Sequence, residues 1–168
     1  MLKHFRRIAP AALLLCVWLS LTGTVKAAAP EDAAPRQKLA ELIAAKAEDQ
    51  PRLLAELADT GSKTVSEVLN AWTRDSVFLY EAPDGSKVPV LLEEQQDAGG
   101  KARAVRIIDG QFLKDAKGVE LRFGSSDLNS AETDMGLRKV IQRTMDSLAL
   151  SDKDPEVRRS AVSKLGNS

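Results

Sequence analysis

The chain has 168 residues, enough for one domain of ordinary size, and its 24 Lys and Arg residues are balanced by 24 Asp and Glu residues. This balance argues against a nucleic-acid-binding protein, which needs a basic face. The one His and the one Cys of the chain, His4 and Cys16, both lie near the N-terminus.

Residues 1–27 have the pattern of a secretory signal peptide. A basic stretch precedes an apolar run of about 14 residues at 8–21, and small residues follow the run. We expect cleavage after Ala27, because Val25 and Ala27 then occupy the −3 and −1 positions. The run is shorter than the ~20 residues that span a bilayer, so an uncleaved membrane anchor is the weaker interpretation.

Removal of residues 1–27 changes the chemistry that remains available. It takes away four basic and no acidic residues and leaves 20 basic against 24 acidic ones, with no His and no Cys. Disulfides, Cys or His metal sites and catalysis by a histidine base are then excluded. The sequence therefore predicts an exported, periplasmic, non-enzymatic protein without a cofactor, without nucleic acid and without a membrane span in the mature chain.

Residues 35–73 are predicted to form three amphipathic helices, preceded by a mobile leader at 28–34. The second helix begins at Pro51 and the third at Ser62, where apolar residues recur at i, i+3, i+4 and i+7. The second and third helices, joined by a turn at Gly61, predict a helical hairpin of the size found in HEAT repeats.

Residues 76–123 predict a small antiparallel β-meander inserted between helical parts. The period changes here to short apolar runs separated by turn sequences. Pro89 has no N–H to donate, which favours an edge position for its strand or a strand that starts beyond Pro89. Because isolated hairpins are marginal in water, the meander must pack on the helices. Strands are expected at 77–80, 88–92, 104–108 and 119–123, with a return at 111–113.

Residues 130–166 predict a second helical hairpin. In its last helix, Asp154 is placed to be the N-cap and Pro155 the first helical residue. A short helix cannot bury its apolar stripe alone, so we expect exposed apolar surface, or a missing continuation of the repeat, near Val162 and Leu165. The first helix has the stripe Leu137, Val140, Ile141, Thr144, Met145 and Leu148, and the second has Val157, Ala161, Val162 and Leu165.

The fold expected from these elements is a single α+β domain over 35–168. It is mostly helical, with HEAT-like helical hairpins flanking the β-meander. No segment has a catalytic pattern. Gly99-Gly100 lacks the Gly-Lys-Ser/Thr of a phosphate loop, and Ser125-Ser126 has no base beside it.

A strip of basic residues is the one candidate contact site for a partner. Arg138, Lys139 and Arg143 lie on the long helix, and Arg158 with Arg159 extends the strip onto the last helix. An acidic partner surface is the functional interpretation. The alternative is an ordinary solvated face that pairs with nearby acidic residues.

The whole layout resembles the N-terminal extracytoplasmic region of the permease subunit of urea ABC transporters, in the branched-chain amino acid permease group. The similarity covers 1–168 and is sharpest at Asp127-Leu128-Asn129-Ser130, Gly136-Leu137-Arg138 and Ser151-Asp152-Lys153-Asp154-Pro155-Glu156-Val157-Arg158. It implies a periplasmic helical-repeat domain placed before a multispanning pore. Its partners would be other importer subunits or a periplasmic binding protein.

The sequence departs from that family after Gly166-Asn167-Ser168, where neither further repeats nor a membrane helix follow. A chain without the pore cannot transport urea alone, so we expect a truncated, split or stand-alone form. No pore residue is transferred to any position here. Two other interpretations remain: a free periplasmic binding or scaffold protein with HEAT-like repeats, and a hydrolase that uses only carboxylates.

Overall fold

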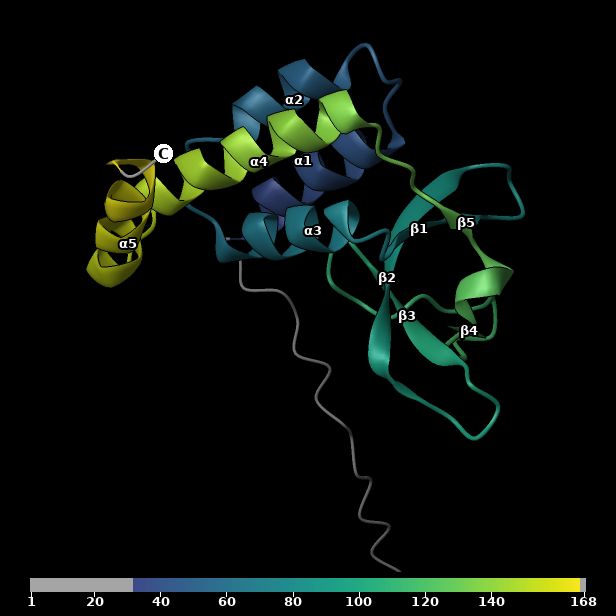
Figure 1. Cartoon of the computed structure of the whole chain (residues 1–168). Coiled ribbons are helices and arrows are strands. Elements are labelled where there is room, and N and C mark those ends of the chain that lie inside the picture. Colours follow the sequence, from purple (N-terminus) through teal and green to yellow (C-terminus); the bar gives the residue numbers. More distant parts are fainter. Residues whose placement is uncertain (1–31, 167–168) are drawn as a thin grey trace, which may run out of the picture.

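The computed structural model describes residues 32–166, so the predicted signal peptide and the cleavage site at Ala27 lie outside the described residues. Within 32–166 the chain is a mixed α and β fold of five α-helices and one five-stranded antiparallel sheet. The helices gather on one side and the sheet on the other (Figure 1). None of the helices in this part of the chain is long and apolar enough to cross a membrane.

Three helices open the fold: α1 (Ala33–Ala44), α2 (Gln50–Leu57) and α3 (Lys63–Thr73). Helix α1 begins two residues before Pro35, so Ala33 and Ala34 are helical and the predicted leader is too long at its C-terminal end. The predicted start of α3 is confirmed, because the Val65 N–H donates to the Ser62 hydroxyl at 3.4 Å. Local capping chemistry therefore fixes this boundary as the sequence indicated.

Helices α2 and α3 do not form the expected HEAT-sized hairpin. Each packs mainly on α1 and on α4 (Met135–Leu150), which comes from the far end of the chain. The apolar stripe of α4 is confirmed as core, since Leu137, Ile141 and Leu148 are buried together with the apolar faces of the first three helices. A long apolar stripe buries more area when it lies between two helices than when it lies beside one. Helix α4 therefore packs on both α2 and α3.

The sheet has the strand order β4-β3-β2-β1-β5. Its first four strands follow one another in space as in sequence, which confirms the meander. The strand β5 was not expected, because two polar residues show no apolar alternation; it pairs with Phe78 and Leu79 of β1. The strands are β1 (Val77–Glu81), β2 (Lys87–Gln96), β3 (Ala102–Arg106), β4 (Arg122–Phe123) and β5 (Asn129–Ser130).

Pro89 lies in β2, the central strand, so the prediction of an edge strand is wrong. Pro89 faces Leu79 across the β1–β2 pair, and its carbonyl accepts the Ile107 N–H at 3.0 Å. Both backbone groups of a residue in an antiparallel strand point to the same neighbour. The missing N–H therefore faces the chain just beyond β3 and removes no hydrogen bond between β1 and β2.

The two faces of the sheet are buried against different partners. Val77 and Ile107 belong to the core of the helical layer, and Leu79 and Leu91 pack against it. The opposite face is covered by the sheet's own return segment. Its small core consists of Phe78, Val90, Ala104 and Leu113, with Leu121, Phe123 and Leu128 packed around them. The meander is thus stabilised on one face by the helices, as expected, and on the other by residues 111–128.

Candidate partner-binding surface

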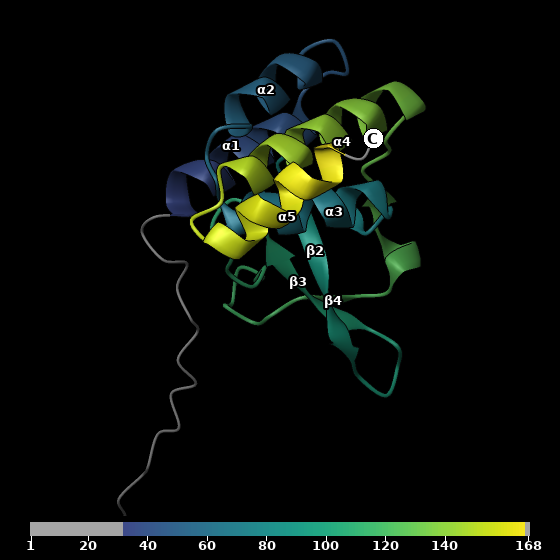
Figure 2. The ribbon, with the colours of Figure 1, turned by 60° about the vertical axis from the view of Figure 1, so that its left-hand side comes forward.

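The C-terminal helices α4 and α5 (Pro155–Gly166) form the hairpin predicted for this part of the chain. The Leu137 N–H donates to the Asp134 carboxylate at 2.6 Å, which caps α4. The Glu156 N–H donates to Asp154 at 2.8 Å, which confirms Asp154 as the N-cap of α5. Helix α5 lies at the side of the helical part that is farthest from the sheet (Figure 1), and Figure 2 shows it from that side, in front of the other helices.

The apolar stripe of α5 is largely uncovered. Only Ala161 is buried, whereas Val157, Val162 and Leu165 keep 38%, 60% and 44% of their surface exposed. The exposed apolar surface predicted near Val162 and Leu165 is therefore confirmed. Burial fails because α5 contacts mainly one neighbour, α4, and a single helix contact covers only one line of residues. Four of the seven large apolar side chains exposed within residues 32–166 lie in 150–165.

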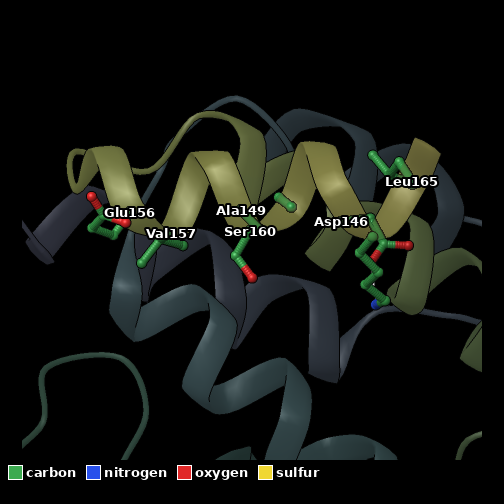
Figure 3. Close-up of a pocket in the computed structure, with 8 residues that line it drawn as sticks. Asp146, Ala149, Glu156, Val157, Ser160 and Leu165 are labelled. Carbon is green, nitrogen blue, oxygen red and sulfur yellow. Dashed lines mark hydrogen bonds and ion pairs between the residues drawn. The ribbon is translucent and has the colours of Figure 1, made fainter. Parts of the chain in front are cut away.

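A groove of about 440 Å³ runs between α4 and α5. Its apolar lining comes from Ala149 of α4 and from Val157, Ala161 and Leu165 of α5. Figure 3 shows Val157 and Ser160 on the same side of α5, and both line the groove. Lys164 and Asp146, which also line the groove, form an ion pair of 3.0 Å.

The groove continues toward α3 as a second cavity of about 340 Å³. Lys63, Ser66 and Asn70 of α3 line one side of this cavity, and Met145 of α4 lies among the other lining residues. Sequence reasoning missed these α3 residues, because a polar face on a local helix gives no indication of which distant helix stands opposite. The missed residues are brought to the groove only by the packing of α4 on α3.

The five residues of the predicted basic strip differ in the contacts that their side chains make. Arg138 turns to the end of α3, where its guanidinium pairs with Asp75 at 2.8 Å and also donates to the Thr133 hydroxyl. Lys139 and Arg143 are exposed, one helical turn apart on α4. Among the residues that the structure describes, no ion pair involves either of these two side chains.

The two arginines of α5 have local contacts. Arg158 donates to the carbonyl oxygens of Asp152 and Lys153 at 2.7 and 3.0 Å and so holds the loop between α4 and α5. Arg159 pairs with Glu156 at 2.6 Å on the surface of the helix. Of the five candidate residues, Lys139 and Arg143 are thus the two whose side chains form neither a hydrogen bond nor an ion pair within residues 32–166.

Charge is unevenly distributed along the described chain. Residues 135–166 hold seven basic and four acidic residues, whereas residues 32–134 hold 13 basic and 19 acidic residues. The hairpin of α4 and α5 is therefore a basic part on an acidic protein. Such a difference favours association of this part with an acidic surface.

Several loop carboxylates have a lowered pKa, which makes the stability of the fold depend on pH in the acidic range. The backbone N–H of Gly124 and then the Lys101 ammonium lower the pKa of Asp127, and the backbone N–H of Lys101 lowers that of Asp97. A carboxylate whose pKa is lower in the folded state than in the unfolded state stabilises the fold at pH values above its ordinary pKa of 3.8. That stabilisation is lost as the pH falls through the pKa of the folded state.

We therefore expect the melting temperature to fall as the pH is lowered from 5 through about 3.8, and to continue falling until these groups are protonated in the folded state. Thermal melts followed by circular dichroism across this range measure the effect. The variant Asp127→Asn should show a shallower dependence than the parent chain. A melting temperature that stays constant from pH 5 to pH 3 would contradict the expectation.

Among residues 32–166, no three acidic side chains gather closely enough to hold a metal ion. The surface around α5 combines exposed apolar side chains with charged ones of both signs, which suit contact with another molecule. No protein-family model matches the chain, and comparisons with curated proteins and with solved structures give no significant match.

Proposed function

We propose that the chain is an exported, non-catalytic protein-contact module: the extracytoplasmic, HEAT-like domain of a urea-type ABC importer permease. The observation that carries the proposal is the uncovered apolar side of α5 beside a groove, with Val162 60% and Leu165 44% exposed. Apolar side chains that cluster on one exposed surface favour a protein interaction site. Importer subunits or a periplasmic binding protein are the partners that the proposal assigns to it.

The sequence resemblance supports the transporter part of the proposal. The segments that carry it, 127–130, 136–138 and 151–158, fall at β5, at the start of α4 and at the loop into α5. Of these, 151–158 leads into the helix that carries the exposed surface, whereas β5 lies in the sheet, at the other end of the fold. Two helices joined by a short loop, with the outer side of the second one uncovered, have the arrangement in which helical repeats stack.

Binding to the cognate urea-binding protein and to the permease subunit tests the function. We expect Val162→Asp to weaken binding of the exported chain about tenfold or more, because it puts a charged carboxylate where the proposal places an apolar contact. Val119→Asp is the matched control, since Val119 is also 60% exposed but lies in the return segment of the sheet. Biolayer interferometry with immobilised partner gives both affinities.

Binding of no importer component would overturn the proposed function. Equal losses from Val162→Asp and Val119→Asp would place the contact away from α5. Circular dichroism of both variants checks that the fold is kept, which we expect because both side chains are exposed.

A further inference from the structure

We propose that the groove between α3, α4 and α5 binds an acidic amphipathic helix of the partner. The inference rests on the proposed function and names the chemistry of the partner segment. It follows from the shape of the groove, from the spacing of its apolar residues and from the charges beside it.

The shape of the groove suits a helix. Helix α5 provides one wall, α3 provides the other, and Met145 and Ala149 of α4 lie between them. The groove is therefore bounded by α4 and α5, and by α3 as well where it continues toward that helix. Amphipathic helices bind in such grooves by placing their apolar face between the walls.

The apolar residues of α5 form a row that matches a helix in spacing. Val157, Ala161 and Leu165 recur every four residues along the groove, and eight residues of helix span about 12 Å. A partner helix that lies alongside α5 would contact this row with its own apolar residues at i, i+4 and i+7. Residues with that spacing lie on one face of a helix. Small residues at the centre, Ser160 and Ala161, allow close approach of its backbone.

The charges beside the groove select an acidic helix. Lys139 and Arg143 lie one turn before Gln142 and Asp146, which line the groove, and neither forms an ion pair within residues 32–166. Two of the four acidic side chains of the hairpin are held in ion pairs, and the other two accept backbone hydrogen bonds. Asp146 pairs with Lys164, Glu156 pairs with Arg159, and Asp152 and Asp154 each accept a backbone N–H. With seven basic against four acidic residues, the hairpin as a whole keeps a net positive charge, which favours an acidic partner segment.

A synthetic helical peptide tests the inference directly. The probe is an 18-residue peptide with Leu at i, i+4 and i+7 and Glu at the flanking positions, and the comparison peptide has Lys in place of each Glu. We expect the acidic peptide to bind the exported chain at least tenfold more tightly, with an affinity that falls as salt is added. Fluorescence anisotropy of the labelled peptides measures both affinities.

Charge reversal locates the site. Lys139→Glu with Arg143→Glu should weaken binding of the acidic peptide at least tenfold and strengthen binding of the basic one. Lys114→Glu with Lys117→Glu is the matched control, because both lysines are exposed on the segment between β3 and β4, and it should change neither affinity by more than about twofold. Nuclear magnetic resonance shifts of Ala149, Val157 and Ala161 amides on peptide addition give an independent location.

Three outcomes would overturn the inference: equal affinity for the two peptides, no effect of the Lys139 and Arg143 reversal, or binding to anionic lipid vesicles without binding to the acidic peptide. If importer components still bind while the reversal has no effect on them, this inference fails and the proposed function stands. If the acidic peptide binds in the groove but no importer component binds, the proposed function fails and the groove assignment stands.

Discussion

Trp72→Ala is expected to lower the free energy of unfolding by about 3–5 kcal/mol. Trp72 is fully buried at the end of α3, in the core that joins the helices to the sheet. Its indole N–H donates to the carbonyl of Ala131 at 2.8 Å, across 59 positions of sequence. The truncation removes a large apolar side chain, leaves a cavity and deprives a buried carbonyl of its donor.

Trp72→Phe separates these contributions. The phenyl ring keeps much of the apolar contact but cannot donate to Ala131, so we expect a loss of about 1–3 kcal/mol. Urea denaturation followed by far-ultraviolet circular dichroism measures both variants. A loss below about 1 kcal/mol for Trp72→Ala would contradict the role of this side chain at the junction of helices and sheet.

Gly61→Ala is expected to cost about 2–4 kcal/mol, the sum of a strained backbone and a steric clash. Gly61 has a φ of +55° in the turn between α2 and α3. A Cβ at this position would lie 2.5 Å from the carbonyl oxygen of Ser151, at the end of α4. The turn and the α4–α5 loop must therefore separate to accommodate it, which also disturbs the base of α5.

Gly100→Ala is the matched control for the backbone part of this loss. Gly100 has a φ of +74°, but a Cβ there would meet no atom within 4 Å, so about 1 kcal/mol is expected. Urea denaturation compares the two variants, and the difference between them measures the contact of the turn with Ser151. Equal losses would show that the close approach at Gly61 has no energetic consequence.

The boundaries of several elements could be predicted because they depend on neighbouring residues. Asp154 caps α5 as the sequence indicated, and Ser62, where α3 was predicted to begin, caps that helix, since a capping side chain bonds to an amide two or three positions away. The strand β5 could not be predicted, because its two residues are held by pairing with β1 and not by their own pattern. The place of Pro89 in a central strand could not be predicted either, because it depends on the pairing of Pro89 with Ile107, just beyond the end of β3.

The candidate surface was predicted only in part. The five basic residues follow from the sequence, but their availability does not: Arg138 is engaged by Asp75, which precedes it by 63 positions. The third side of the groove was missed because Ser66 and Asn70 lie on a helix predicted to pack elsewhere. Exposure of the last helix near Val162 was predicted, because a short helix with a single neighbour cannot bury its whole stripe.

By itself the sequence determined the five helices and the first four strands, where capped helices begin, and that the chain beyond residue 27 has neither His nor Cys. These properties depend on composition or on residues a few positions apart. The tertiary structure decided that α4 packs on α2 and α3, that the sheet has two buried faces, and that α3, α4 and α5 enclose a groove. Such contacts join segments that are distant in sequence, and the burial of apolar area that selects them is non-directional, so no local pattern specifies the partner.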